Sequence, residues 1–287
     1  MSDSKLYLVY EGLLLPAHVH SEESVRYARE EFQVRDDDVF IVTYPKSGTT
    51  WMQEILPIIY SNGDLTPVLT IPNWDRVPWL EQTTAQLTLE NKPSPRLITT
   101  HMLYHLMPKS FYTSKAKVIY VVRNPKDVLV SSFYYHGIAI FLDNPGTFEE
   151  FMQRFLEGNV IFGSWFDHVK SWWALKDNEN VLFVSYEEML QNMKGMVVKI
   201  SEFLGKPLSD DMIEVIVNQS QFNNMRENKM SNYKLVPNEI LDQTKTNVLR
   251  KGISGDWKNH FTTAQAEHFD SLYTQRMKGL NFTFYKD

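Results

Sequence analysis

The stretch Val39-Phe40-Ile41-Val42-Thr43-Tyr44-Pro45-Lys46-Ser47-Gly48-Thr49-Thr50-Trp51 decides the fold of this chain. Its apolar start predicts a buried strand, and the helix-like residues after it predict a loop that ends at a helix N-terminus. The first N–H groups of a helix have no partner inside it, and the helix dipole adds about half a positive charge there. The loop therefore predicts an anion site, with a close backbone approach, a positive charge and hydroxyl groups supplied by Gly48, Lys46, Ser47, Thr49 and Thr50.

The spacing of this loop differs from that of a Walker A loop. A Walker A loop has its lysine directly after the second glycine, whereas Lys46 precedes the only glycine of this loop by two positions. An ordinary ATPase or GTPase is therefore disfavoured. Taken alone, the loop is equally compatible with an ordinary polar turn between a strand and a helix.

Composition narrows the class of protein. The chain has 287 residues, 43% of them hydrophobic, which allows one large domain or two small ones, and we expect a single domain over residues 1–287. With 29 basic and 35 acidic side chains the net charge is −6, which gives nonspecific nucleic-acid binding no electrostatic basis. The absence of cysteine excludes disulfides, thiolate catalysis and cysteine-ligated zinc. We find no signal peptide and no apolar span of membrane length, so we expect a soluble cytoplasmic protein without a membrane association.

Four apolar runs predict strands, at residues 39–43, 96–100, 117–122 and 181–184. Because helical patterns alternate with these runs, we expect an α/β fold of three layers, with a central parallel sheet and helices on both faces. Ligands of such sheets bind beyond the carboxyl ends of the strands. The four strands would end at the Lys46 loop, at His101, at Arg123 and at the turn formed by Ser185 and Tyr186, all facing one crevice.

The remaining chain gives less definite predictions. Pro57 predicts a kink or an early end in the helix at 51–60, near Leu56. Residues 61–95 predict a long irregular excursion, and residues 5–20 an apolar cover without regular structure. Residues 185–188 resemble a capping box. Further helices are expected at 21–32, 124–135, 148–155, 165–175, 193–204, 209–218 and 262–277.

Three further features could carry chemistry. Arg123 precedes a well-capped helix that carries Ser131, and an arginine with a hydroxyl suits a second phosphate, although this pair alone is more typical of a helix-start salt bridge. Residues 249–257 combine two basic residues with two glycines. Without further evidence, a basic turn of this kind is typical of a solvated surface. His101 could accept a proton from a hydroxyl, although a single histidine is more often structural. No H-E-x-x-H motif or carboxylate cluster predicts a metal site.

Together these motifs resemble those of the cytosolic sulfotransferases. The loop at 43–51 resembles their phosphosulfate-binding loop, residues 123–131 their 3'-phosphate segment, and residues 250–257 their C-terminal signature. The resemblance runs from about residue 5 to about residue 285, with the three motifs in the family's order. The alcohol and hydroxysteroid branch is the most similar, through residues 163–168 and 227–233.

The resemblance implies that the sulfuryl donor is 3'-phosphoadenosine-5'-phosphosulfate (PAPS), the product nucleotide is 3'-phosphoadenosine-5'-phosphate (PAP), and no metal is required. It implies that His101 takes the proton of the acceptor hydroxyl while that oxygen attacks sulfur in line. Lys46 would stabilise the departing nucleotide, and Ser47 would restrain Lys46 until the acceptor is present. The residues implied for the nucleotide are Lys46, Ser47, Gly48, Thr49, Thr50, Trp51, Arg123, Ser131, Tyr186, Ser220, Phe222, Met225, Arg250, Lys251 and Gly252.

The acceptor pocket implied by the resemblance is mostly aromatic, which favours a flat lipophilic alcohol such as a sterol, with a bile alcohol or a smaller alcohol left open. Phenol-preferring members carry a lysine where this chain has Thr99, which disfavours a phenol or xenobiotic sulfotransferase. The usual His-Leu-Pro becomes His101-Met102-Leu103. The residues implied for the pocket are Trp74, Trp79, Tyr135, His136, Phe141 and those at 233–241.

The family's dimer motif is present with one change. It occurs as Lys258, Thr262 and Glu267, but Thr263 replaces its valine, so we expect at most a weak homodimer. Two other functions stay open at this stage. One is a nucleotide-binding protein without catalysis, which the presence of both Lys46 and His101 disfavours. The other is a nucleotide kinase, which would need a Walker loop and magnesium.

Overall fold

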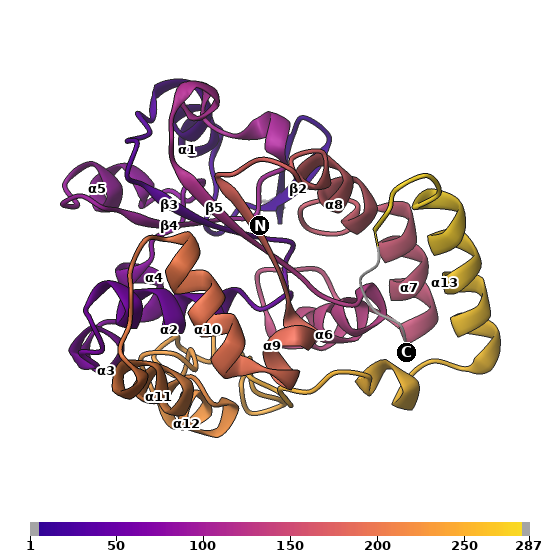
Figure 1. Ribbon diagram of the computed structural model, residues 1–287. Helices are drawn as coiled ribbons and strands as arrows, with labels where there is room; N and C mark the ends of the chain where they lie inside the picture. Colours follow the sequence, from indigo (N-terminus) through magenta and orange to yellow (C-terminus); the bar gives the residue numbers. More distant parts are fainter. Residues whose placement is uncertain (1–5, 283–287) are drawn as a thin grey trace.

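The sheet at the centre of the molecule is parallel, as the sequence predicts. The computed structural model describes residues 6–282, and its four-stranded sheet has the order β4-β3-β5-β6 (Figure 1). The central strand pairs with both neighbours, and Val42 lies opposite Thr100 on one side and Tyr120 on the other. The strand bounds are β3 (Val39–Thr43), β4 (Leu97–Thr100), β5 (Lys117–Val122) and β6 (Val181–Ser185).

Side chains of the sheet alternate between two apolar cores. Phe40 and Val42 of β3 belong to one core, which is shared with α1 (Glu22–Arg26) and α8 (Trp165–Trp173). Val39 and Ile41 belong to the other, which is shared with α2 (Thr49–Tyr60), α10 (Met193–Phe203) and α11 (Asp210–Gln219). In Figure 1 the first pair of helices lies above the sheet and the second group below it. The predicted single α/β domain of three layers is confirmed.

Helix α2 continues through Pro57 to Tyr60, so the predicted early end near Leu56 is wrong. Proline lacks an N–H, which leaves the carbonyl of Gln53, four residues earlier, without its helical partner. Nε of Arg76 donates to this carbonyl at 3.0 Å. The helix continues because a side chain from a distant segment replaces the missing hydrogen bond.

The N-terminal segment is a hairpin, not an irregular cover. Strands β1 (Tyr7–Tyr10) and β2 (Leu13–Pro16) pair antiparallel. Glu11 and Gly12 between them have φ values of 48° and 81°. Positive φ at both positions is what the tight turn of a two-residue hairpin requires, and Leu13 and Leu15 then point into the core.

The predicted irregular excursion at 61–95 contains three short helices, α3 (Thr66–Thr70), α4 (Asn73–Arg76) and α5 (Ala85–Glu90). Each has at most six residues, too few to show helical periodicity in a sequence. The expected helix at 21–32 is α1 followed by a π-helix at Tyr27–Glu31. Ser185 Oγ accepts from the N–H of Glu188 but donates to Glu187, so only half of the expected capping box forms.

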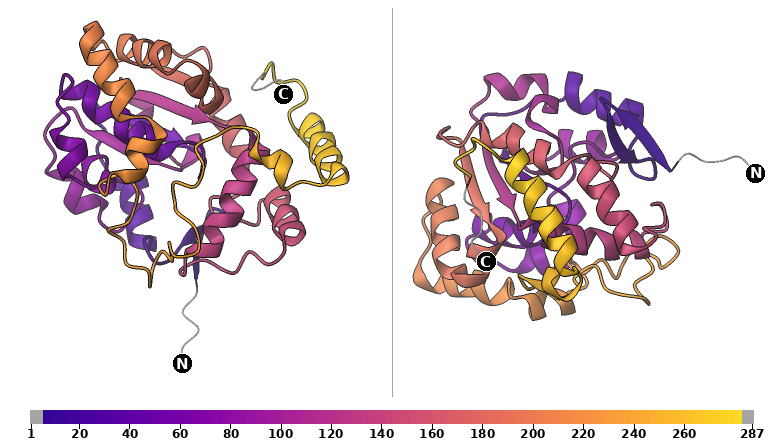
Figure 2. Two further views of the ribbon diagram at one scale, coloured as in Figure 1. Left: turned by 90° about the horizontal axis from the view of Figure 1, so that it is seen from below. Right: turned by 90° about the vertical axis from the view of Figure 1, so that its right-hand side faces the viewer.

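The other expected helices are present, with ends that differ by a few residues. Helix α13 lies beside α7 at one edge of the molecule (Figures 1 and 2) and packs through Phe269 against Phe155 and Phe166. The bounds are α6 (Pro125–Ile138), α7 (Phe148–Glu157), α9 (Tyr186–Gln191), α12 (Phe222–Glu227) and α13 (Thr263–Arg276), with 3₁₀ turns at Tyr104–Leu106, Lys109–Thr113 and Asp256–Asn259.

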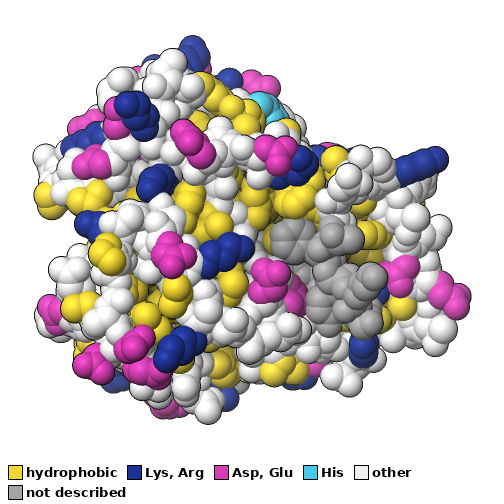
Figure 3. All heavy atoms as spheres, viewed as in Figure 1, with side chains coloured by type: hydrophobic (Ala, Val, Ile, Leu, Met, Phe, Trp, Pro, Cys, Tyr) yellow, Lys and Arg dark blue, Asp and Glu magenta, His cyan; other side chains and the backbone are white. Residues whose placement is uncertain are grey.

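Residues 228–255, which we call the covering segment, follow α12 without helix or strand and pack on the end of α6. The N–H of Ile140 donates to the carbonyl of Ile240 at 3.0 Å, and the N–H of Asp242 donates to that of Ile138 at 2.8 Å. On the face shown in Figure 3, basic and acidic side chains are interspersed over the surface. Among residues 6–282, no helix combines the length and hydrophobicity needed to cross a membrane.

Candidate active site

A cavity of about 610 Å³ lies at the carboxyl ends of the four strands. The residues that follow β3, β4, β5 and β6 all line it, as the crevice rule for parallel sheets predicts. Of the predicted site residues, all but Ser47 and His136 line this cavity: Lys46, Gly48, Thr49, Thr50, Trp51, Trp74, Trp79, His101, Arg123, Ser131, Tyr135, Phe141, Tyr186, Ser220, Phe222, Met225, Arg250, Lys251 and Gly252.

His101 is held in one tautomer at the end of β4. Its Nδ1 lies 2.6 Å from the carbonyl oxygen of Thr43, which can only accept, so Nδ1 carries the hydrogen and Nε2 has a free lone pair. The N–H of His101 donates to Glu81 Oε1 at 2.9 Å, and the Trp79 ring lies 4.6 Å from the imidazole. Burial lowers the pKa of His101 to about 3, so the ring is neutral and able to accept a proton at neutral pH.

The pKa of Lys46 is also lowered. Burial, together with the nearby cations Arg123 and Arg250, lowers the pKa of Lys46 to about 7. Its Nζ lies over the ring of Tyr135, 4.3 Å from the centroid. Ser47 Oγ is buried without a partner, so the expected contact between Ser47 and Lys46 is absent in this structure.

The N-terminus of α2 leaves its first N–H groups open to the cavity. Gly48 is the N-cap, with φ 115°, and no side chain caps the helix. A side chain at this position would be strained by φ, and its Cβ would lie 3.1 Å from the ring of Tyr186. Glycine at 48 therefore provides both the left-handed turn and the close packing that the predicted anion site requires.

Arg123 joins the Lys46 loop to the covering segment. Its guanidinium donates to the carbonyl of Lys46 at 3.0 Å and to that of Ile253 at 3.2 Å, and it lies over the ring of Tyr186. Its Nε has no partner. The strand that ends at Arg123 thus fixes the relative positions of two loops that are far apart in sequence.

Arg250 and Lys251 share one buried carboxylate. Each lies 2.6 Å from an oxygen of Asp256, which is 2% exposed. These pairs and hydrogen bonds hold the pKa of Asp256 well below its usual range, against the effect of burial. Asp127 in turn accepts from the N–H groups of Gly255 and Trp257, which anchors the turn that carries Asp256. Arg250 and Lys251, both predicted to contact the nucleotide, are therefore held in place by the protein.

Further residues of the predicted nucleotide site come from four elements. Trp51 of α2 lies against Tyr186 of α9, with ring centroids 5.2 Å apart. Phe222 of α12 packs against Gly252, where a Cβ would come within 2.2 Å of the ring. Ser220, at the end of α11, is fully buried and its Oγ has no partner. The cavity thus has an aromatic slot next to its cationic end.

The other end of the cavity is mainly aromatic. Trp74 lies 5.6 Å from Tyr233 of the covering segment, and Phe141 stacks on His18 at 5.1 Å. Together with Trp79 and Tyr135, these rings enclose an apolar space beside His101.

His136 was predicted to line the acceptor pocket, and the structure contradicts this. Its Nδ1 lies 3.3 Å from Asp143, and its ring packs on Phe151 of α7. Successive residues of a helix point about 100° apart. Because Tyr135 of α6 faces the cavity, the next residue along the helix faces α7 instead.

Several cavity residues were not predicted. His18, His20 and Phe162 line the cavity, the first two just after the N-terminal hairpin. No motif marks them, because the hairpin that places them was not predicted. His168 of α8 is fully buried, with Nε2 2.9 Å from the carbonyl of His101.

The family is decided by comparison with known proteins. The family model of the sulfotransferase domain matches residues 36–281. The chain belongs to this sulfotransferase family. It is 49% identical over 274 residues to mouse sulfotransferase 2B1, which covers 96% of this chain and 81% of the relative. It is 46% identical over 279 residues to the guinea pig 3-beta-hydroxysteroid sulfotransferase, which covers 97% of this chain and 96% of the relative.

Two solved structures share the architecture of this enzyme. Mouse sulfotransferase SULT7A1, solved in complex with PAP, matches with a TM-score of 0.81 and 35% identity over 96% of each chain. Retinol dehydratase, at 23% identity and a TM-score of 0.84, shares the fold over 97% of this chain and 90% of its own. Within residues 6–282, no cluster of three or more metal-ligating side chains accompanies the sulfotransferase cavity.

Proposed function

We propose that this sulfotransferase transfers the sulfuryl group of PAPS to the hydroxyl of a lipophilic alcohol, namely a hydroxysteroid. The observation that carries the proposal is a single cavity with a cationic end, an apolar aromatic end, and both Lys46 and neutral His101 on its wall. The names of the relatives and the PAP complex of the mouse enzyme support the same donor and acceptor class.

The residues at the cationic end fit the nucleotide. Two buried polar atoms without a partner, Ser220 Oγ and Nε of Arg123, occur there, and an unpaired buried polar atom is costly unless a ligand satisfies it. Gly48 and Gly252 keep the space that a Cβ would fill. The residues that we propose to hold PAPS are the predicted ones, from Lys46 to Trp51, with Arg123, Ser131, Tyr186, Ser220, Phe222, Met225, Arg250, Lys251 and Gly252.

His101 is the proposed base. Its Nε2 takes the proton of the acceptor hydroxyl, while the carbonyl of Thr43 holds the ring and accepts from Nδ1. A positioned base of this kind contributes roughly 10²–10⁴ in rate. PAPS supplies the sulfuryl group, and Lys46 places a positive charge where negative charge develops on the departing nucleotide.

The aromatic end of the cavity is the proposed acceptor pocket. Trp74, Trp79, Tyr135 and Phe141 present flat apolar surfaces, which suit a fused-ring alcohol.

We also propose a cytoplasmic location and a weak homodimer. The proposed dimer contacts are Lys258, Thr262, Thr263 and Glu267. All four are exposed, three of them at the start of α13 and Lys258 in the preceding turn.

The test is a comparison of wild type with His101→Ala. Wild type should sulfate a hydroxysteroid faster than a phenol, a bile alcohol or an amine, with PAPS as donor and without a metal. His101→Ala should lose about 10²–10⁴ in kcat and still bind PAP as wild type does. Full activity of His101→Ala would refute the base, and a wild type that binds PAP but sulfates none of the acceptors would favour a silent nucleotide-binding protein. Loss of turnover with a metal chelator would favour a kinase.

A further inference from the structure

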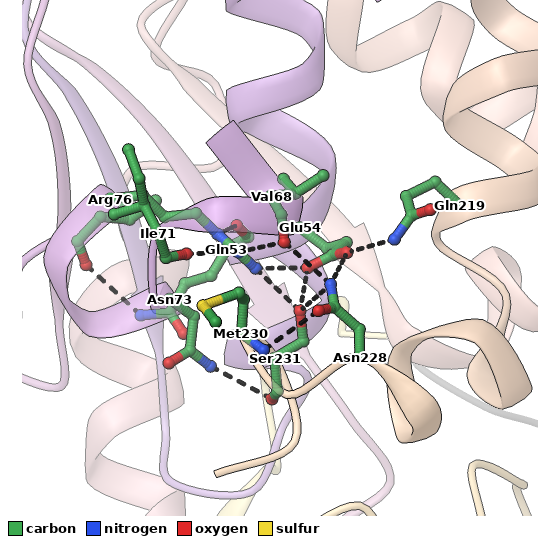
Figure 4. Close-up of polar contacts among 11 residues, drawn as sticks. Gln53, Glu54, Val68, Ile71, Asn73, Arg76, Gln219, Asn228, Met230 and Ser231 are labelled. Carbon is green, nitrogen blue, oxygen red and sulfur yellow. Dashed lines mark hydrogen bonds and ion pairs between the residues drawn. The ribbon is translucent and has the colours of Figure 1, made fainter. Parts of the chain in front are cut away.

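A buried polar network lies outside the cavity, around the carboxylate of Glu54 (Figure 4). Glu54 belongs to α2 and is fully buried, and neither it nor its ion-pair partner Arg76 lines the cavity. Arg76 is 5% exposed, and its guanidinium donates to Glu54 Oε2. A buried carboxylate must have all its lone pairs satisfied to be tolerated, so its partners are informative.

Both oxygens of Glu54 accept from other segments. Ser231 Oγ, from the covering segment, donates to Oε2 at 2.5 Å. Gln219 Nε2, from the end of α11, donates to Oε1 at 3.0 Å, and Asn228 Nδ2 approaches the same oxygen at 3.4 Å. Figure 4 shows these side chains pointing toward the carboxylate from different elements.

Arg76 extends the network to α3 and α4. It donates to the carbonyls of Gln53, Val68 and Ile71 at 3.0, 3.0 and 2.9 Å. The carbonyl of Gln53 is the one that Pro57 leaves unpaired. The ion pair therefore fastens the segment at 68–76 to α2 at the turn where the helix lacks its own hydrogen bond.

Three partners of Glu54 lie within two residues of one that lines the cavity. Gln219 precedes Ser220 at the nucleotide end. Arg76 lies in the same short helix as Trp74, and Ser231 lies two residues before Tyr233, whose ring contacts Trp74 at the acceptor end. The N–H of Asn73 also donates to the carbonyl of Met230 at 2.9 Å, which joins α4 directly to the covering segment.

We propose that Glu54 is a positioning residue that couples the two ends of the cavity. Helix α2 begins at the anion-binding loop and carries Trp51 one turn before Glu54, so a movement of the helix on nucleotide binding is passed through the carboxylate to Trp74 and Tyr233. The proposal rests on the proposed function for the identity of the two ligands. Its consequence is that PAP changes the affinity for the hydroxysteroid, and that this change depends on Glu54.

The experiment measures hydroxysteroid binding with and without saturating PAP, and PAP binding with and without the steroid. Coupling between two sites is typically about 5–150-fold and equal in both directions. In wild type we expect at least about a fivefold change. In Glu54→Gln, which keeps the shape but removes the charge, and in Ser231→Ala, which keeps the ion pair, we expect less than about a twofold change.

A matched control is the buried pair of Arg96 and Asp38. It lies at the amino ends of β3 and β4, away from the cavity, with 2.6 Å between Arg96 NH2 and Asp38 Oδ2. Asp38→Asn should lower Tm, as Glu54→Gln should, but leave the coupling at the wild-type value. A purely stabilising role of Glu54 would give all three variants the same coupling.

The outcomes separate this inference from the proposed function. If wild type does not bind PAP, the proposed function fails. The next outcome concerns a wild type that binds PAP and the hydroxysteroid with measurable coupling. If Ser231→Ala and Glu54→Gln then show the same coupling as wild type, Glu54 is not the positioning residue. If Glu54→Gln does not fold, Ser231→Ala alone decides. Equal affinities in wild type with and without the second ligand would also overturn the inference.

Discussion

At the scale of single residues, the environment of each side chain decides its charge. His101 and Lys46 both lose much of their tendency to bind a proton, because burial disfavours the charged form. For His101 the result is a neutral ring across the whole physiological range. For Lys46 it is a pKa of about 7, so the free enzyme is poised between the charged and neutral forms.

We therefore expect the enzyme to take up a proton at Lys46 when the nucleotide binds. An anion beside the ammonium favours its charged form, so its pKa should rise from about 7 when PAP binds. At pH 8 binding should take up a substantial fraction of a proton, and PAP affinity should fall as the pH rises from 7 to 9. Calorimetry in buffers of different ionisation enthalpy measures the uptake. Lys46→Met should abolish it, and proton release by wild type would contradict the assigned pKa.

We expect replacement of His20 to change the preference between acceptors. Its Nδ1 donates to the carbonyl of Pro16, and burial lowers its pKa to about 4, so Nε2 is a hydrogen-bond acceptor without a protein partner. His20→Phe should lower kcat/KM for a dihydroxysteroid by about fivefold relative to a monohydroxysteroid, the value of one hydrogen bond. Steady-state kinetics with a matched steroid pair measure this ratio. An unchanged ratio would show that Nε2 does not contact the acceptor.

At the scale of elements, the site depends on how loops pack against helices. The turn at residues 250–257 has two glycines with positive φ, Gly252 at 67° and Gly255 at 82°. Only the first lies against a ring, that of Phe222 of α12, whereas a Cβ at Gly255 would meet nothing within 4 Å. The two positions therefore separate backbone strain from packing.

Gly252→Ala should weaken PAP binding much more than Gly255→Ala does. Both variants strain the backbone, but only the first forces the Phe222 ring and the basic turn apart. We expect at least about a tenfold loss of PAP affinity for Gly252→Ala, which corresponds to about 1.4 kcal/mol, and less than half that free energy for Gly255→Ala. Fluorescence or calorimetric titration measures both. Equal losses would mean that strain, not contact with Phe222, sets the affinity.

At the scale of the whole molecule, a sheet with two cores brings four loops to one edge, and the chain after α12 closes the crevice from the other side. Charges of both signs are interspersed on the face shown in Figure 3, whereas Arg123, Arg250 and Lys46 gather at the cavity. The positive potential is thus local to the nucleotide end of a protein whose net charge is −6.

Thr263 gives a prediction for assembly. It is exposed at the first position of α13, next to the capping residue Thr262. If this patch forms a symmetric dimer, Thr263→Val buries about one more methyl-sized group per subunit, at ~0.8 kcal/mol each. The dimer Kd should fall by roughly tenfold in sedimentation equilibrium. Glu267→Lys should weaken the dimer, and a monomer in both wild type and Thr263→Val would exclude this interface.

The sequence by itself determined the sheet, the anion-binding loop and most of the cavity residues. Apolar runs of four to six residues predict buried strands, and the residues that directly follow them must meet at one edge. Local rules are sufficient here because strand ends and helix N-termini have fixed directions. The motif order then specified the sulfotransferase family, which the comparison confirmed.

Only the tertiary structure decided which direction other side chains take and what they contact. In the folded chain His136 points toward Asp143, Arg76 donates a hydrogen bond to the carbonyl of Gln53, and His20 lines the cavity. These outcomes depend on contacts between segments that are far apart in sequence, such as Glu54 with Ser231. A local pattern carries no information about such partners, because burial and hydrogen bonding are set only when the elements pack together.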